Sequence, residues 1–173
     1  MRELILGGAR SGKSALAQQR AEASGLGVTC IVTATPDDAE MAERIAHHQA
    51  NRPPAWCIVE APIELTAALM EHADQDHCLL VDCLTLWLSN ILSDGENTFE
   101  QQRAALLDTL PQLPGRIILV GNEIGLGVIP MGKLTRRFVD ENGRLHQEIA
   151  SRCERVTLCM AGLPTTLKDD QKT

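Results

Sequence analysis

A glycine-rich segment near the start of the sequence could hold the phosphates of a nucleoside triphosphate. Residues 7–14 read GGARSGKS and fit the P-loop pattern G-x-x-x-x-G-K-[ST], between an apolar run and a helical pattern. Backbone N–H groups in such a loop turn toward phosphate oxygens, and the next helix adds its N-terminal partial charge. Lys13 should reach the β- and γ-phosphates, and the Ser14 hydroxyl should bind Mg²⁺. The predicted phosphate-binding residues are Gly7, Gly8, Ala9, Arg10, Ser11, Gly12, Lys13 and Ser14.

A P-loop also needs an acid at the end of a neighbouring strand to complete the Mg²⁺ shell. The apolar run at residues 78–82 ends in Asp82, which is its only carboxylate. Asp82 also precedes a helical pattern and could cap that helix, a role compatible with binding Mg²⁺. We therefore expect Ser14 and Asp82 to be the protein ligands of the metal.

Two adjacent histidines lie in a predicted helix at residues 37–50. Met41, Ile45 and His48 share one helix face, whereas His47 projects about 100° away, toward the more polar side. A neutral imidazole can attack phosphorus and form a phosphoramidate, and Arg44 lies one turn before His48. From the pattern alone, a core histidine satisfied by a hydrogen bond is the more common interpretation of His48, so both readings stay open.

The elements that would position these residues alternate between short β-rich runs and helical patterns. This alternation predicts parallel strands joined by crossover helices, in an α/β three-layer sandwich of the P-loop NTPase type. The predicted strands are residues 3–6, 28–34, 56–60, 78–82, 116–120 and 155–160. The predicted helices are residues 13–23, 37–50, 62–73, 84–92, 98–110 and 133–152. We expect one domain over residues 1–168 and a frayed tail over residues 169–173.

Composition excludes several classes of partner. The 173 residues carry a net charge of −7 and only 2% aromatic side chains, which argues against nucleic acid. No apolar run approaches the roughly 18–20 residues of a membrane span, and no cleavable signal precedes the first strand. The six cysteines show no zinc-ligand spacing and are expected to be mostly buried, reduced thiols. A cytoplasmic protein is the prediction.

Taken together, these motifs resemble the bifunctional adenosylcobinamide kinase/adenosylcobinamide-phosphate guanylyltransferases of cobalamin biosynthesis. The resemblance spans roughly residues 3–160, with the blocks in family-like order. The P-loop is the first block. The later blocks comprise Asp38, Glu40, Met41, Arg44, Ile45, His48, Arg52 and Pro53; Trp56 and Glu60; Asp82, Cys83, Leu84, Thr85 and Asn90; and Asn122, Glu123, Ile124, Gly125, Gly127, Pro130, Arg136, Phe138, Asp140 and Gly143.

The resemblance implies two reactions. In the first, ATP or GTP phosphorylates the hydroxyl of the aminopropanol arm of adenosylcobinamide. In the second, GTP transfers GMP to an enzyme histidine with release of pyrophosphate, and the GMP passes on to give adenosylcobinamide-GDP. The histidine that closes R-I-x-x-H in the family falls on His48. The resemblance further implies a homo-oligomer, with a trimer as the expected form.

Several residue roles follow from the resemblance as hypotheses. Arg10 and Arg44 are candidate α-phosphate clamps, because a guanidinium matches phosphate oxygens bidentately. Glu60 is expected among the nucleotide contacts. Glu123 could serve Mg²⁺, the substrate or guanine, or could pair with a nearby arginine, and the sequence does not rank these options. The loop with Gly125 and Gly127 is expected to close part of the pocket.

Two positions depart from the family pattern: Val139 replaces the arginine of F-R-D, and His146 replaces the asparagine of Asn-Gln. These departures put in doubt the contacts that the family makes with residues 138–147, at the side of the site away from the P-loop, and they leave the P-loop and His48 unaffected. Two other functions stay open. One is a P-loop small-molecule kinase without nucleotidyl transfer, which leaves the His48 block unused. The other is a GTPase-like switch, against which the chain lacks an N-K-x-D-type guanine motif.

Overall fold

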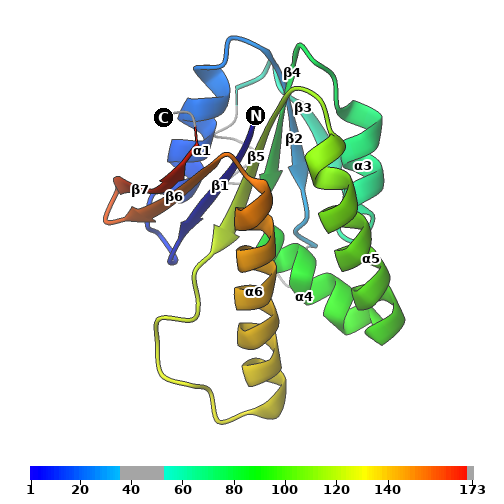
Figure 1. Ribbon diagram of the computed structural model, residues 1–173, viewed down its shortest axis with the longest axis vertical. Helices are drawn as coiled ribbons and strands as arrows, with labels where there is room; N and C mark the ends of the chain where they lie inside the picture. The colour runs from blue at the N-terminus through cyan, green and yellow to red at the C-terminus, as the bar shows by residue number, and fades with distance from the viewer. Residues whose placement is uncertain (36–52, 171–173) are drawn as a thin grey trace.

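The computed structural model describes residues 1–35 and 53–170, and within them seven strands form one sheet (Figure 1). The strands are β1 (Arg2–Gly7), β2 (Gly27–Val32), β3 (Cys57–Glu60), β4 (His77–Asp82), β5 (Arg116–Asn122), β6 (Arg155–Met160) and β7 (Leu163–Asp169). Their order across the sheet is β3-β2-β4-β5-β1-β6-β7. Every neighbouring pair is parallel except β6 and β7, which are antiparallel. Because β1 lies between β5 and β6, residues 8–12 leave the sheet between the carboxyl end of β5 and that of β6.

Helices cover both faces of the sheet, which makes three layers (Figure 1). They are α1 (Lys13–Glu22), α3 (Leu65–His72), α4 (Leu84–Asp94), α5 (Glu96–Thr109) and α6 (Lys133–Arg152), with a short 3₁₀ turn, η1 (Leu110–Gln112). One apolar cluster lies between α1 and the sheet, and a larger one lies between the sheet and α3–α6. No helix in the described part of the chain has the length and hydrophobicity needed to cross a bilayer.

The apolar runs of the sequence form the buried strands. β1, β2, β4 and β5 are almost continuously buried, as parallel strands must be when helices cover both faces. The predicted α/β fold is confirmed, and α6 has the predicted bounds. Five of the six cysteines are buried thiols outside any disulfide, as expected, and Cys57 is exposed at the start of the edge strand β3.

The sequence analysis missed β7. Its residues, LPTTLKD, are mostly exposed and include Pro164, so neither a continuous apolar run nor an alternation marks the strand. β7 lies at the edge of the sheet and pairs only with β6 within the described chain, after a tight turn in which Ala161 and Gly162 have φ of 52° and 78°. It extends to Asp169, one residue past the boundary predicted at residue 168, and the Asp170 N–H donates to the Glu154 carbonyl at 2.9 Å. Residues 171–173 and the predicted helix at 37–50 lie outside the described residues.

Candidate active site

The P-loop and the predicted acids that the structure describes all lie along the carboxyl edge of the sheet. The register pairs Val32 with both Glu60 and Asp82, and pairs Gly7 with Asn122. The P-loop, Asp82 and Glu123 therefore leave strands β1, β4 and β5 at one edge, where ligands bind in open α/β sheets. The crossover connections that make the sheet parallel also bring these distant segments together.

The P-loop turns sharply between β1 and α1. Arg10 and Gly12 both have positive φ, 55° and 93°, and the Ser11 N–H donates to the Gly8 carbonyl at 3.3 Å. Lys13 begins α1, and its ammonium donates to the same carbonyl at 3.1 Å. No side chain of the described residues caps the start of α1, so within that part of the chain its first N–H groups face the loop without a side-chain acceptor. Such a concave set of amides at a helix start is suited to bind an anion.

The turn between β6 and β7 holds the P-loop from the side; we call residues 159–162 the clamp. The Gly162 N–H donates to the Ser11 carbonyl at 2.8 Å, and the Cys159 thiol donates to it at 3.1 Å. A Cβ on Gly7 would lie 2.5 Å from the Cys159 carbonyl oxygen and 2.4 Å from Ser11 Oγ. Glycine is therefore required at position 7 by packing inside the apoprotein, in addition to any need for a close approach to phosphate.

Lys13 and Asp82 are electrostatically coupled at this edge. Burial lowers the pKa of the Lys13 ammonium, and the nearby Asp82 carboxylate opposes that shift. A partly buried cation beside free amides favours a polyanionic ligand, because the ligand replaces the hydration that the ammonium has lost. The Ser14 hydroxyl and the Asp82 carboxylate offer hard oxygen ligands, the type that Mg²⁺ prefers, so their chemistry fits the predicted metal.

Three side chains that the sequence analysis gave no role fix the loops around Asp82. The Thr33 hydroxyl donates to the Cys83 carbonyl at 2.7 Å and accepts from the Cys83 N–H at 3.0 Å. Thr85 Oγ1 accepts from the Asn122 N–H at 2.7 Å and so joins the start of α4 to the end of β5. The Asn90 amide donates to the Thr33 and Pro62 carbonyls at 2.8 and 3.0 Å. Thr85 and Asn90 belong to the family blocks, whereas Thr33 carries no sequence signal beyond its place in the predicted strand at residues 28–34.

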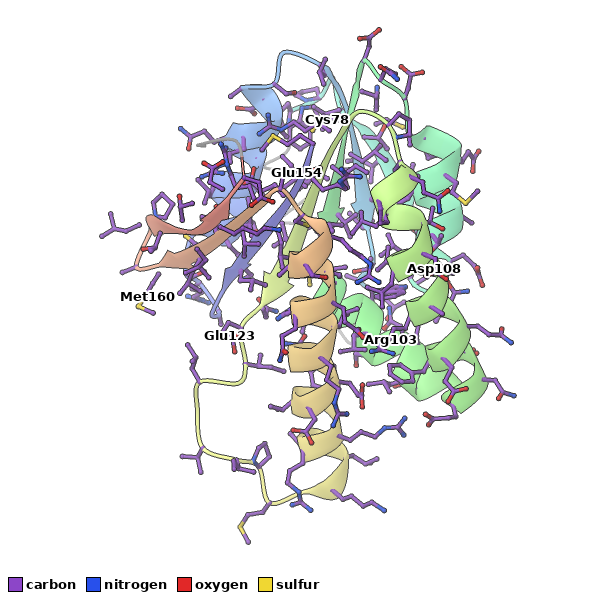
Figure 2. The ribbon with its side chains drawn as sticks, viewed as in Figure 1. Cys78, Arg103, Asp108, Glu123, Glu154 and Met160 are labelled. Carbon is purple, nitrogen blue, oxygen red and sulfur yellow. The ribbon has the colours of Figure 1, made fainter. Side chains whose placement is uncertain are left out.

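Glu123 lies one residue past β5, beside the P-loop. Figure 2 shows it at the base of the long loop, at the same end of the sheet as Met160 on β6. Its N–H donates to the Gly7 carbonyl at 3.0 Å, and its Oε1 accepts from the Gly125 N–H at 2.6 Å. Glu123 also lines a cavity of about 330 Å³ between the P-loop and the clamp. The cavity lining comprises Gly8, Ala9, Arg10, Ser11, Glu123, Leu126, Leu158, Cys159, Met160 and Ala161.

His146 is a buried neutral base beneath Glu123. Burial lowers the pKa of its imidazole to about 4, against the opposing charge of Glu123. Its Nδ1 lies 3.5 Å from the Asn142 amide nitrogen, which donates to the Asn122 carbonyl at 3.1 Å. His146 Nε2 has no partner among the described residues, and a Cβ on Gly121 would lie 2.6 Å from it. The His146 departure thus lies under the site, packed against β5, and not in a solvent-exposed pocket.

Arg10 of the P-loop and two arginines of α6 differ in what they contact. Arg10 is exposed and makes no hydrogen bond or ion pair within the described part of the chain, so it is available for a ligand. Arg136 donates to the Pro130 carbonyl at 3.1 Å, and Arg137 pairs with Glu96 at 2.5 Å and lies over the Phe99 ring. The two α6 arginines therefore hold the preceding loop and α5.

Glu60 lies far from the P-loop. β3 is separated from β1 by three strands, so four strand spacings place Glu60 roughly 19 Å away. A contact with the nucleotide would therefore involve its nucleoside end. His48 and Arg44 lie outside the described residues. The first described range ends at Thr35, which lies three residues past β2 at the same carboxyl edge as Asp82.

A buried acid on β1, the strand before the P-loop, connects that strand to its neighbours. Glu3 on β1 is fully buried, pairs with Arg20 of α1, and lies 3.6 Å from an Arg116 nitrogen on β5. The Thr157 hydroxyl on β6 donates to it at 3.3 Å. One carboxylate thus links the helix and both strands that flank β1.

Comparison with known proteins identifies the family to which this chain belongs. The model of the family described as cobinamide kinase / cobinamide phosphate guanyltransferase matches residues 3–167. A bifunctional adenosylcobalamin biosynthesis protein, CobP of Pseudomonas aeruginosa, is 58% identical over 171 residues, covering 98% of this chain and 99% of that protein. CobU proteins of the same description are 34% identical in Salmonella typhimurium and 31% identical in Escherichia coli. Each alignment covers 95% of this chain and 98% of the relative.

A solved structure from Pyrococcus horikoshii has the same general fold. It superposes with a TM-score of 0.56 over 99% of this chain and 87% of its own, at 10% sequence identity. At that identity the likeness concerns the arrangement of the sheet and helices alone.

Proposed function

Because this chain belongs to the cobinamide kinase / cobinamide phosphate guanyltransferase family, we propose that it carries out both reactions of that name. ATP or GTP first phosphorylates adenosylcobinamide. GTP then gives GMP to the enzyme and on to the phosphorylated corrinoid, which yields adenosylcobinamide-GDP and pyrophosphate. The observation that carries the proposal is the preformed P-loop, with Lys13 and Asp82 at one sheet edge, inside a chain aligned over nearly its full length with bifunctional relatives.

The P-loop side supplies charge stabilisation for both reactions. The amides of residues 8–13 and the Lys13 ammonium would neutralise the charge that develops on the leaving diphosphate or pyrophosphate. Ser14 and Asp82 would hold Mg²⁺, which supplies further positive charge to the phosphate oxygens when bound. Arg10, exposed at the crest of the loop, would bind an α-phosphate oxygen.

The guanylyl carrier in this proposal is His48. Its support is the R-I-x-x-H pattern, which follows shortly after Thr35 in the sequence, and Thr35 lies at the edge that carries the P-loop and Asp82. Arg44, one helical turn before His48 by sequence, would hold the α-phosphate during attack. Glu60 would contact the nucleoside end of GTP.

The acceptor is a corrinoid, and the enzyme is proposed to work as a homo-oligomer, a trimer by family resemblance. An exposed apolar surface supports this proposal. The loop after Glu123 extends away from the sheet beside the first turns of α6 (Figure 1). We call residues 124–134 the arm. Its apolar side chains Leu126, Val128, Ile129, Met131 and Leu134 are all largely exposed, at 96% and 97% for Val128 and Met131. Exposed patches of this kind mark interaction surfaces. The cytoplasmic location stays a prediction.

The test is a two-stage assay with purified protein, Mg²⁺, adenosylcobinamide and ATP, followed by GTP. Mass spectrometry should detect adenosylcobinamide phosphate in the first stage and adenosylcobinamide-GDP in the second. Lys13→Ala should abolish both products, because both leaving groups depend on the P-loop. A protein that stops after the first product would be a single-activity kinase. A protein that hydrolyses GTP slowly and modifies no corrinoid would be a regulatory switch, and either result would contradict the bifunctional proposal.

A further inference from the structure

Among the described acids at the carboxyl edge, Glu123 lies nearest to the P-loop. β5 is the direct neighbour of β1, so Glu123 leaves the sheet about 5 Å from the strand that carries Gly7. Asp82 leaves it two strand spacings away, and Glu60 four. A group that takes a proton from an attacking hydroxyl must lie within hydrogen-bond reach of that hydroxyl. The distance across the sheet therefore selects Glu123 over Glu60.

One oxygen of the Glu123 carboxylate accepts a hydrogen bond, and the other accepts none from the described residues. The bond from its N–H to the Gly7 carbonyl fixes its backbone to the P-loop, and the Gly125 N–H holds Oε1. Oε2 accepts no hydrogen bond from any residue that the structure describes. A carboxylate with one oxygen anchored and the other open is suited to receive a proton.

Glu123 lines the cavity of about 330 Å³ beside the P-loop, and among the described residues of that lining it is the only acid. The other titratable groups near it are Arg10 and Cys159 in the same lining, Lys13 at the loop and His146 beneath. His146 is neutral above its lowered pKa, so it adds no cation that would hold the carboxylate in an ion pair. The volume is large enough for the hydroxyl-bearing end of an acceptor, and smaller than a whole corrinoid.

We propose that Glu123 is the general base of the phosphoryl-transfer step, an assignment that rests on the proposed kinase function. The acceptor hydroxyl donates to Glu123 Oε2 while its oxygen attacks the γ-phosphorus. A bond forms between that oxygen and phosphorus, and the bond from phosphorus to the β–γ bridging oxygen breaks. The electron pair leaves on the nucleoside diphosphate, beside Lys13, and the proton moves to Oε2 and then to water. Guanylylation of the enzyme without an acceptor has no hydroxyl to deprotonate and so does not require Glu123.

The variant Glu123→Gln tests this role with little structural change. The glutamine Oε1 can still accept from the Gly125 N–H, but the side chain cannot take up a proton. With adenosylcobinamide and γ-labelled ATP, kcat should fall by about 10²- to 10⁴-fold while KM for ATP changes little. Labelling of the enzyme by α-labelled GTP should persist. Glu100→Gln, on the exposed face of α5, is the matched control and should behave as wild type.

A second variant separates a chemical role from a structural one. Glu123→Ala should be as slow as Glu123→Gln, and added formate should restore part of its kinase rate, because a small carboxylate can enter the vacated space. Kinase activity of Glu123→Gln within a few-fold of wild type would overturn the assignment. Loss of both phosphorylation and self-labelling in Glu123→Gln, with no response of Glu123→Ala to formate, would also overturn it and indicate a metal-binding or structural role. Wild-type protein that binds ATP and phosphorylates no corrinoid would overturn the proposed function itself, and this role with it.

Discussion

The P-loop and the arm leave neighbouring strands at the same edge of the sheet, and the chain holds them very differently. The P-loop is fixed by hydrogen bonds from the clamp, by the contact between its lysine and its own carbonyl, and by the strand beneath it. The arm is held at its two ends, by Glu123 and by Arg136, and exposes its apolar side chains between them. The P-loop is thus held in place within one chain, whereas the arm presents apolar surface that no part of the described chain covers.

The sharpest test of this contrast places the same small side chain in each region. Gly7→Ala puts a Cβ 2.5 Å from the Cys159 carbonyl, so the P-loop and the clamp must separate. We expect nucleotide affinity to fall at least about 100-fold, equivalent to about 2.7 kcal/mol, as in a severe overpacking change. Isothermal titration with a non-hydrolysable GTP analogue measures the loss. Gly127→Ala, in the arm, places its Cβ within 4 Å of no described residue and should leave affinity unchanged. Equal effects of the two substitutions would refute the contrast.

The next largest effect is on the free energy of unfolding, and it compares an ion pair on the P-loop strand with one beside the arm. Glu3→Gln leaves Arg20 and Arg116 without their carboxylate, behind the P-loop strand. Because both arginine side chains are partly exposed, we expect a loss of about 2–3 kcal/mol in the free energy of unfolding, below the full penalty for a buried pair. Glu96→Gln breaks the exposed pair with Arg137 beside the arm and should cost less than about 1 kcal/mol. Urea unfolding measures both variants, and a smaller loss for Glu3→Gln than for Glu96→Gln would contradict the account.

His146 predicts a pH dependence of stability beneath the site. Its folded pKa of about 4 lies below the ordinary value of 6.5, so between these values the unfolded chain binds a proton that the folded chain does not. Stability attributable to His146 is present above pH 6.5 and is lost as the pH falls toward 4. By pH 5 the loss should reach about 2 kcal/mol relative to pH 7.5. Urea unfolding of wild type and His146→Gln at both pH values isolates this contribution. Parallel pH profiles would show that the imidazole titrates normally.

The smallest expected effect on stability lies in the arm. Val128→Ser with Met131→Ser should change the free energy of unfolding by less than about 0.5 kcal/mol per site, because both side chains are almost fully exposed. If the arm is the surface that joins subunits, the double variant should also shift the protein to a smaller species in light scattering after gel filtration. An unchanged oligomer would place the subunit contact elsewhere.

Sequence reasoning predicted those parts of the molecule whose signal is local. The strands β1, β4 and β5 read as continuous apolar runs because both faces of the sheet are covered, and the P-loop is specified by glycine and lysine spacing. The position of Asp82 at the end of β4 could be predicted because a lone carboxylate ends an apolar run, and its role as a metal ligand stays a prediction.

The features that sequence reasoning missed depend on contacts between distant segments. The clamp acts through a backbone N–H at Gly162, a thiol at Cys159 and a carbonyl at Ser11, groups that no residue pattern distinguishes. β7 lacks an apolar pattern because it is an exposed edge strand. His146 was noticed only as a departure from a family pattern, and its burial against Gly121 became visible with the packing of α6 on β5.

The most direct test of the central claim is covalent labelling by GTP. Purified protein with Mg²⁺ and α-labelled GTP, without corrinoid, should acquire one label that survives alkali and is lost in acid, as a phosphoramidate is. Peptide mapping should place the label on His48, so that His48→Ala abolishes it and His47→Ala retains it. A protein that phosphorylates adenosylcobinamide yet acquires no label, or a label that persists in His48→Ala, would contradict the account of one site serving both transfers.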